Sequence, residues 1–169
     1  MRILSIDPGE TSAFVIGEVR PALGSVHSLC VTSWGAWSGL EELALLVENS
    51  LFKGLDAIVI EDYRVYSSKA QQHIGSQVYT IREIGRIEWL AFKDATNIVY
   101  QMASQAKGRW PTSRMRMYPA VKGFLVHPGL KRYKDKRKHI IDAYRHLLTY
   151  LETAEAIEFN DVIEWTYDD

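Results

Sequence analysis

Two acidic residues of this chain each follow a short run of strand-forming residues. Asp7 follows residues 2–6 and precedes Pro8-Gly9, and Glu61 follows the similar run at residues 57–60. Aliphatic and β-branched residues favour strands, and a Pro-Gly pair ends one. If the two strands are parallel neighbours, both carboxylates lie at the edge where open α/β sheets bind ligands. Two carboxylates this close require a cation, and oxygen ligands favour Mg²⁺ or Mn²⁺.

A third set of candidate ligands lies on the predicted last helix, which starts near residue 135. His139 and Asp142 are three residues apart and therefore lie on nearly one face, with His146 a further turn along. A histidine and an aspartate in this arrangement can chelate one metal ion, and an ordinary polar helix face is the alternative. The apolar side of the helix lies roughly opposite, so the first turn would have to overhang the edge of the sheet.

Charge is segregated along the chain. Residues 101–148 hold 12 Lys and Arg against 2 Asp and Glu, whereas residues 149–169 hold 7 acids and no Lys or Arg. The basic stretch predicts a binding surface for nucleic acid phosphates, with Trp110, Tyr118 and Tyr133 as stacking surfaces. The alternative is a solvated face neutralised by the acidic tail. The candidate DNA-binding residues are Arg109, Arg114, Arg116, Lys122, Lys131, Arg132 and Lys134.

The predicted strands and helices around these residues indicate one α/β domain over residues 1–169. Three strands with short connections predict an antiparallel meander, and the later strands, each preceded by a helix, are expected to run parallel to the first. A basic irregular segment is expected at 108–134 and an acidic tail at 152–169. The expected strands are 2–9, 13–19, 26–37, 57–61 and 97–102, with helices at 39–52, 67–94 and from 135.

Composition excludes several other classes of protein. No apolar stretch reaches the roughly 20 residues of a membrane helix, and the first residues lack the layout of a signal peptide. The expected location is the cytoplasm, or the host cytoplasm if a phage encodes the protein. The single cysteine, Cys30, excludes an intramolecular disulfide and a cysteine-based zinc site, and its apolar neighbours indicate a core thiol.

Taken together, these motifs resemble the RuvC Holliday junction resolvases of the RNase H-like superfamily. The matching features are Asp7 in Ile-Asp-Pro-Gly, Glu61 after the fourth strand, and His139-Ile-Ile-Asp142-Ala143 on the last helix. Phage members are the most similar, because they share the extended pattern H-x-x-D-A-x-R-H found at residues 139–146. Residues 100–107 also resemble the end of the family's fifth strand, where a lysine assists catalysis, and Lys107 is the matching position.

This resemblance implies an RNase H-like fold with a five-stranded mixed sheet and a metal-dependent endonuclease that resolves four-way and other branched DNA. Asp7 would bridge two Mg²⁺ or Mn²⁺ ions, with Glu61 on one and Asp142 and His139 on the other. Lys107 would neutralise charge on the reacting phosphate. Many relatives carry an acid at the position of His139, and a nitrogen ligand shifts the preference toward Mn²⁺.

Other functions remain open from the sequence. Within the same superfamily, the chain could act on flaps, RNA/DNA hybrids or packaging intermediates. A nucleotide phosphotransferase also presents Asp-x-Gly after a first strand, as in Asp7-Pro8-Gly9, although that fold usually needs two such domains. A DNA-binding module without catalysis would use the basic stretch alone, and the acids Asp7, Glu61 and Asp142 argue against it.

A homodimer is expected because resolving a four-way junction needs two cuts, which a two-fold dimer supplies. The candidate interface is the long helix at 67–94, where Gly85 allows close approach and an apolar stripe exceeds what one thin sheet covers. The alternative is a stripe that packs entirely on the chain's own sheet. The stripe consists of Ile74, Val78, Ile81, Ile84 and Ile87.

Overall fold

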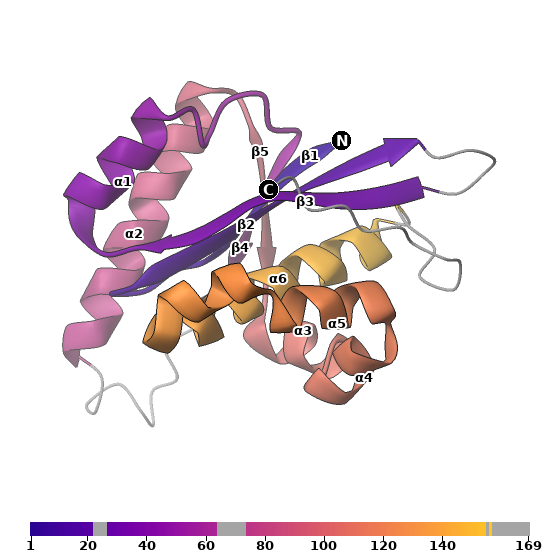
Figure 1. Cartoon of the computed structure of the whole chain (residues 1–169). Helices are drawn as coiled ribbons and strands as arrows, with labels where there is room; N and C mark the ends of the chain where they lie inside the picture. The colour runs from indigo at the N-terminus through magenta and orange to yellow at the C-terminus, as the bar shows by residue number, and fades with distance from the viewer. Residues whose placement is uncertain (22–26, 64–73, 155, 157–169) are drawn as a thin grey trace.

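A five-stranded mixed sheet forms the centre of the molecule (Figure 1). The computed structural model describes residues 1–21, 27–63, 74–154 and 156. The sheet order is β3-β2-β1-β4-β5, so the first strand is also the central one. Cys30 is buried on β3, as predicted. The strands are β1 (Arg2–Asp7), β2 (Ser12–Pro21), β3 (His27–Trp37), β4 (Ala57–Glu61) and β5 (Asn97–Gln101).

Strand direction follows the sequence-based prediction. β1, β2 and β3 are antiparallel, whereas β4 runs parallel to β1 and β5 parallel to β4. Ile6 pairs with Ile60 across β1 and β4, so the next residues, Asp7 and Glu61, leave the sheet at the same edge. The predicted α/β fold with a mixed sheet is therefore confirmed.

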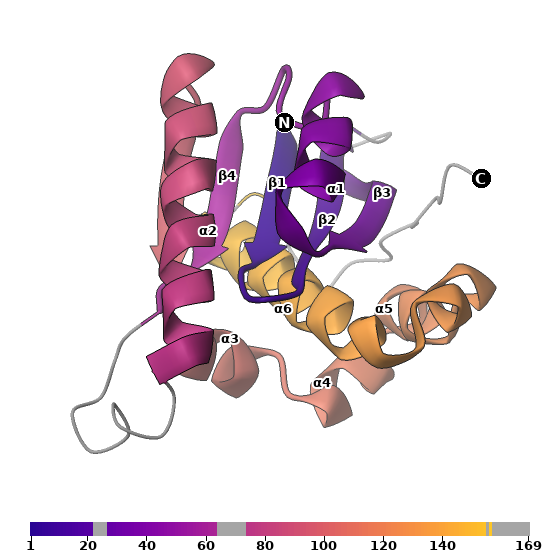
Figure 2. The same ribbon diagram turned by 90° about the vertical axis from the view of Figure 1, so that its left-hand side faces the viewer.

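Helices cover both faces of this sheet (Figures 1 and 2). One face carries α1 and α2, and the other carries α6 with a layer of shorter helices beyond it. No helix in the described part of the chain has both the length and the apolar character needed to cross a membrane. The helices are α1 (Gly39–Glu48), α2 (Ile74–Lys93), α3 (Ala103–Arg109), α4 (Thr112–Met117), α5 (Pro119–Val126), the 3₁₀ helix η2 (Pro128–Lys136) and α6 (Arg137–Thr153).

Alternation along β1 divides the core in two. Leu4 and Ile6 pack toward α1 and α2, whereas Ile3 packs toward α6. Because side chains alternate across a strand, Ser5 and Asp7 share the α6 face with Ile3. The buried Ser5 hydroxyl donates a hydrogen bond of 2.7 Å to the backbone carbonyl of Ala143. This contact fixes α6 against the central strand one residue after Asp142.

The segment at 108–134 differs from the irregular structure expected for it. It forms α4, α5 and most of η2, whose apolar side chains pack against α6. Each element begins at a proline: Pro111 precedes α4, Pro119 starts α5 and Pro128 starts η2. Proline is favoured at a first helical turn, and these helices are too short to display a clear apolar period. The acidic tail from residue 157 onward lies outside the described residues.

We expect the Ser5→Ala substitution to lower the free energy of unfolding by about 0.5–1.5 kcal/mol, because it removes one buried hydrogen bond between β1 and α6. Urea denaturation measures the change. Ser28→Ala is the matched control, since the Ser28 hydroxyl makes only an exposed hydrogen bond, to Arg20. Equal stability of the Ser5→Ala variant and the control would show that the Ser5 contact does not anchor α6.

Candidate active site at the carboxyl edge of the sheet

Asp7 and Glu61 end neighbouring parallel strands and face α6. Asp7 is only 8% exposed and the turn at Pro8-Gly9 follows it directly. In the register of the sheet, Glu61 also lies opposite Gln101, which ends β5. Three parallel strands therefore bring polar side chains to one edge, two of them acids. This arrangement is the one that the sequence predicted for the two acids.

α6 adds His139 and Asp142 above this edge. Asp142 is 5% exposed, and its neighbours Ala143 and Tyr144 are fully buried. The sequence had implied an overhanging first turn, because the apolar stripe lies opposite the polar pair. The structure removes that conflict, since α6 lies between the sheet and the layer of α3, α4 and α5 and is buried on most sides. Both faces of the helix therefore have partners.

His139 and Asp7 form a direct pair. Nδ1 of His139 lies 2.8 Å from Oδ2 of Asp7, and the pairing raises the pKa of the imidazole above its ordinary value. Burial raises the pKa of Asp7 to about 6, although the hydrogen bond from His139 acts in the opposite direction. The negative charges of Glu61 and Asp142 also raise it. Burial and the two neighbouring acids therefore favour the protonated form of Asp7, and His139 opposes them.

Glu61 is held by His146, and Gln101 in turn orients the His146 ring. Nε2 of His146 lies 3.4 Å from Oε2 of Glu61, and the buried His146 ring also contacts Gln101. With its nitrogen donating to Nδ1 of His146 at 3.2 Å, the Gln101 amide leaves the Nε2 proton facing Glu61. Burial acts to raise the pKa of Glu61, but the hydrogen bond and charge of His146, a hydrogen bond with Asp7 and the charge of Lys107 together outweigh burial and lower the pKa.

Asp142 is paired with two cations. The Arg145 guanidinium contacts one carboxylate oxygen, and Nζ of Lys107 lies 3.6 Å from the other. Arg145 also donates to Thr112 Oγ1 at 2.8 Å and to the Trp110 carbonyl, so α4 fixes its position. Lys107 is half-exposed on α3. The lysine that the resemblance singled out therefore lies beside the third acid.

The donor set fits a divalent cation in type. Within the described ranges, no three His, Cys, Asp or Glu side chains are already arranged to hold an ion. His146 and Arg145 instead occupy oxygens of Glu61 and Asp142. Burial, and to a smaller extent the charges of Glu61 and Asp142, raise the pKa of Asp7, and a bound cation would favour its ionised form. Asp7, Glu61, Asp142 and His139 are the residues that would hold it.

The predicted DNA-binding residues fall into three groups. Arg109 and Arg114 pair with Glu152, and Arg114 also lies over the Trp110 ring at 4.1 Å. Trp110 is fully buried, so the expectation that it stacks on bases is wrong, and its ring instead packs in the core beside α6. The second group, Lys131 and Arg132, is exposed on η2. The third group lines a pocket and consists of Arg116, Lys122 and Lys134.

No protein-family model matches the chain, and no curated protein matches it in sequence. Solved structures match it in fold. RuvC of T. thermophilus in complex with a Holliday junction substrate gives a TM-score of 0.66 at 15% identity, covering 92% of this chain and 96% of RuvC. The fowlpox virus Holliday junction resolvase gives 0.51 at 15% identity over 91% and 99% of the two chains. The yeast mitochondrial Holliday junction resolvase gives 0.52 at 13% identity over 89% and 77%.

These similarities confirm the predicted resemblance at the level of the fold. The chain has the RNase H-like fold of RuvC, with three antiparallel strands followed by two parallel ones. At 13–15% identity, the roles of individual residues rest on the geometry described above.

The raised pKa of Asp7, caused first by burial and then by the neighbouring acids, predicts a pH-dependent effect of Asp7→Asn on stability in the absence of divalent metal. The folded-state pKa of Asp7, about 6, exceeds the ordinary value of 3.8, so the folded chain binds more protons than the unfolded chain between these values. The contribution of Asp7 to stability is therefore full below pH 4 and falls as pH rises through 6. The Asp7→Asn variant does not titrate at this position. Between pH 4 and pH 7 its free energy of unfolding should therefore rise, relative to that of the wild type, by up to about 3 kcal/mol.

Thermal or urea unfolding in a chelator, repeated across this pH range, measures the difference. Glu10→Gln is the control, because Glu10 is an exposed acid in the turn after β1. Stability curves of wild type and Asp7→Asn that stay parallel from pH 4 to pH 7 would contradict the raised pKa assigned to Asp7.

Proposed function

We propose that this protein is a metal-dependent endonuclease that hydrolyses DNA phosphodiesters at four-way junctions and other branched structures. The observation that carries the proposal is the meeting of Asp7, Glu61 and Asp142, from β1, β4 and α6, at one edge of an RNase H-like sheet. The similar solved structures include RuvC in complex with a Holliday junction substrate and two further junction resolvases, which supports the same class of substrate.

In this proposal Asp7, Glu61, Asp142 and His139 hold the metal, with Mg²⁺ or Mn²⁺ as the expected ions. Two such ions, when bound, would activate the attacking water and stabilise the leaving 3′ oxygen. Asp7 lies at the centre because it faces both His139 and the other two acids. His146 orients Glu61, and Arg145 orients Asp142. Each of these two contacts would have to break so that the carboxylate oxygen could bind the metal.

Cations around this edge would bind the DNA. The half-exposed amino group of Lys107 is placed to meet a phosphate oxygen next to Asp142. Arg116, Lys122, Lys131, Arg132 and Lys134 are exposed on α4, α5 and η2 and offer further phosphate contacts. Arg109 and Arg114 could join this surface only by leaving Glu152. The basic surface would therefore determine the affinity for DNA, and the acids would carry out the cleavage chemistry.

The direct experiment is a cleavage panel of four-way junction, flap, linear duplex and RNA/DNA hybrid with Mg²⁺ or Mn²⁺. We expect the wild type to cut the four-way junction and Asp7→Asn to bind it without cutting. Glu10→Gln, which alters an exposed acid three residues away, should cut normally. Cleavage of the junction by Asp7→Asn would overturn the assignment, and preferred cleavage of the hybrid would replace junctions with hybrids as substrate.

A homodimer through α1 and α2 is the second part of the proposal. On α2, Ile87 is fully buried and Ile84 packs partly on the core, so this part of the predicted stripe covers the chain's own sheet. Ile81, by contrast, is 56% exposed, and Trp89 and Phe92 are exposed farther along the helix. The side chains of the other two stripe residues, Ile74 and Val78, lie outside the described part.

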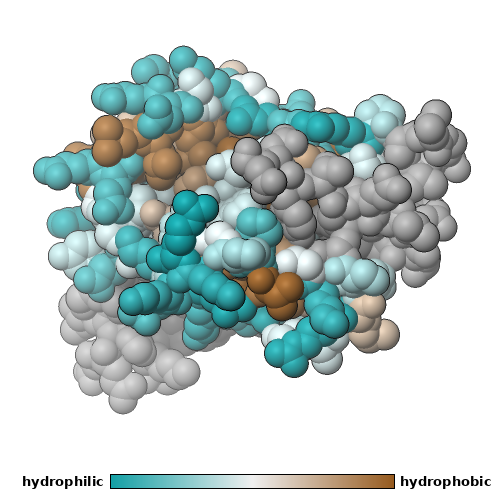
Figure 3. Space-filling model, viewed as in Figure 1, coloured by the Kyte–Doolittle hydropathy of each residue, from teal (hydrophilic) through white to brown (hydrophobic). Residues whose placement is uncertain are grey.

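An apolar groove accompanies these exposed side chains. It has a volume of about 570 Å³ and lies between Leu40 and Val47 on α1 and Gly85 and Trp89 on α2. Figure 3 shows the hydrophobic patch over these helices, away from the basic helices. A Cβ atom at Gly85 would meet nothing within 4 Å, so a partner helix can approach there. Such a surface suits an isologous two-fold contact, which would pair two active sites.

We expect the wild type to be a dimer at micromolar concentration and Phe92→Glu to be a folded monomer, because Phe92 is 85% exposed and contributes little to the core. Light scattering measures mass and circular dichroism measures folding. Met117→Glu is the matched control, since Met117 is 77% exposed on α4 and should leave the dimer intact. A wild type that is already monomeric would exclude paired sites without affecting the nuclease assignment.

A further inference from the structure

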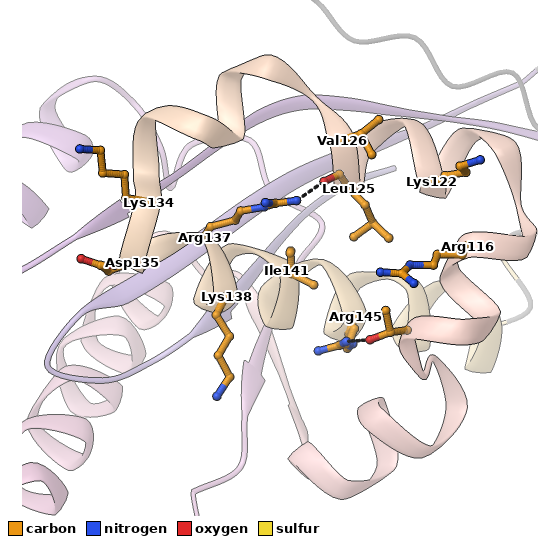
Figure 4. Close-up of a pocket in the computed structure, with 11 residues that line it drawn as sticks. Arg116, Lys122, Leu125, Val126, Lys134, Asp135, Arg137, Lys138, Ile141 and Arg145 are labelled. Atoms are coloured by element: carbon orange, nitrogen blue, oxygen red, sulfur yellow. Dashed lines mark hydrogen bonds between the residues drawn. The ribbon is translucent and has the colours of Figure 1, made fainter.

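A cationic pocket opens on the α6 side of the molecule, beside the acidic edge (Figure 4). It has a volume of about 790 Å³, which falls within the range of small-molecule sites, roughly 300–1,000 Å³. Its apolar part is formed by Leu125 and Val126 at the end of α5 and by Ile141 on α6. Six cationic side chains surround it: Arg116, Lys122, Lys134, Arg137, Lys138 and Arg145.

Two of the arginines are fixed in place by the protein. Arg137 donates to the Leu125 carbonyl at 2.6 Å, and Arg145 donates to Thr112 Oγ1 at 2.8 Å. Figure 4 shows the Arg116 side chain extending from α4 into the same cavity. Guanidinium groups bind phosphate oxygens through paired donors, and fixed groups lose less entropy on binding. Among the described residues that line the pocket, Asp135 is the one acid, so this lining favours an anion.

We propose that this pocket binds one unpaired nucleotide of the DNA substrate, with its phosphate against Arg116 and Arg137 and its base on Leu125, Val126 and Ile141. The inference rests on the proposed function in taking DNA as the ligand. If the cations formed only a solvated basic face, the exposed aliphatic side chains beneath them would have no function. A paired duplex presents its phosphates outward and keeps its bases stacked, so only an unpaired base reaches such a floor.

The pocket adjoins the candidate active site. Arg145 belongs to its lining and also contacts Asp142, and Lys138 of the lining precedes His139. A nucleotide held here would therefore belong to a strand that passes close to the acids. Branched DNA supplies such a nucleotide where strands separate, whereas linear duplex does not. The pocket would thus contribute to the choice of branched DNA over duplex.

Two variants with the same change in charge test the pocket. Val126 is 63% exposed and lines it, whereas Met117 is 77% exposed on α4 and does not. Both substitutions to glutamate leave the buried core intact, and thermal unfolding verifies this. Binding of a short labelled thymidine oligonucleotide, alone and paired with its complement, is measured by fluorescence anisotropy in a chelator, so that no cleavage occurs.

Val126→Glu should weaken binding of the single strand at least about fivefold, the lower end of the loss known for one base–aromatic stack, because it replaces an apolar contact to the base with a negative charge. It should weaken binding of the duplex much less. Met117→Glu should have a smaller effect, on both the single-strand affinity and the duplex affinity, than Val126→Glu has on the single-strand affinity. Equal losses from the two variants, equal losses for single strand and duplex, or no loss with Val126→Glu would each overturn the pocket assignment. Junction cleavage is assayed separately. Absence of cleavage would contradict the proposed function, and the oligonucleotide affinities would still test the pocket.

Discussion

The gathering of three acids at one partly buried edge of the sheet is the constraint on which the rest of this site depends. Asp7, Glu61 and Asp142 come from three elements; Asp7 and Asp142 are buried and Glu61 is partly exposed. Burial first, and then the charges of the other two acids, disfavour the ionised form of Asp7. Each acid has its own counter-group: His139 for Asp7, His146 for Glu61, and Arg145 with Lys107 for Asp142. Such pairing keeps the acids in place without metal. It also means that metal must compete with side chains already present.

The sheet and α6 act together to impose this crowding. Parallel pairing of β1 and β4 fixes the spacing of Asp7 and Glu61, and the Ser5 hydroxyl ties α6 to β1 beside Asp142. The layer of α3, α4 and α5 then covers the outer face of α6, and through Thr112 it fixes Arg145. The basic helices therefore have two roles, because they support α6 and also carry the cationic surface.

The sequence predicted the features that depend on local pattern. Asp7 and Glu61 were found because each follows a short apolar run, and the spacing of His139 and Asp142 on one helix was equally local. The roles of Gln101 and His146 were missed, because they meet Glu61 only through strand pairing and helix packing. A polar residue at the end of β5, beside a histidine one turn after Asp142, was the available signal. Trp110 was misread because burial depends on α6, not on neighbouring charges.

The central claim is that the edge formed by Asp7, Glu61 and Asp142 is a divalent metal site. Crystals of the protein soaked in Mn²⁺ and measured at its absorption edge test this directly, because anomalous scattering locates the ion independently of activity. The account predicts Mn²⁺ coordinated by the carboxylates of Asp7, Glu61 and Asp142, with the His146 side chain displaced from Glu61 and the Arg145 side chain displaced from Asp142. Ordered Mn²⁺ elsewhere, with these three carboxylates still bound only to protein groups, would contradict it.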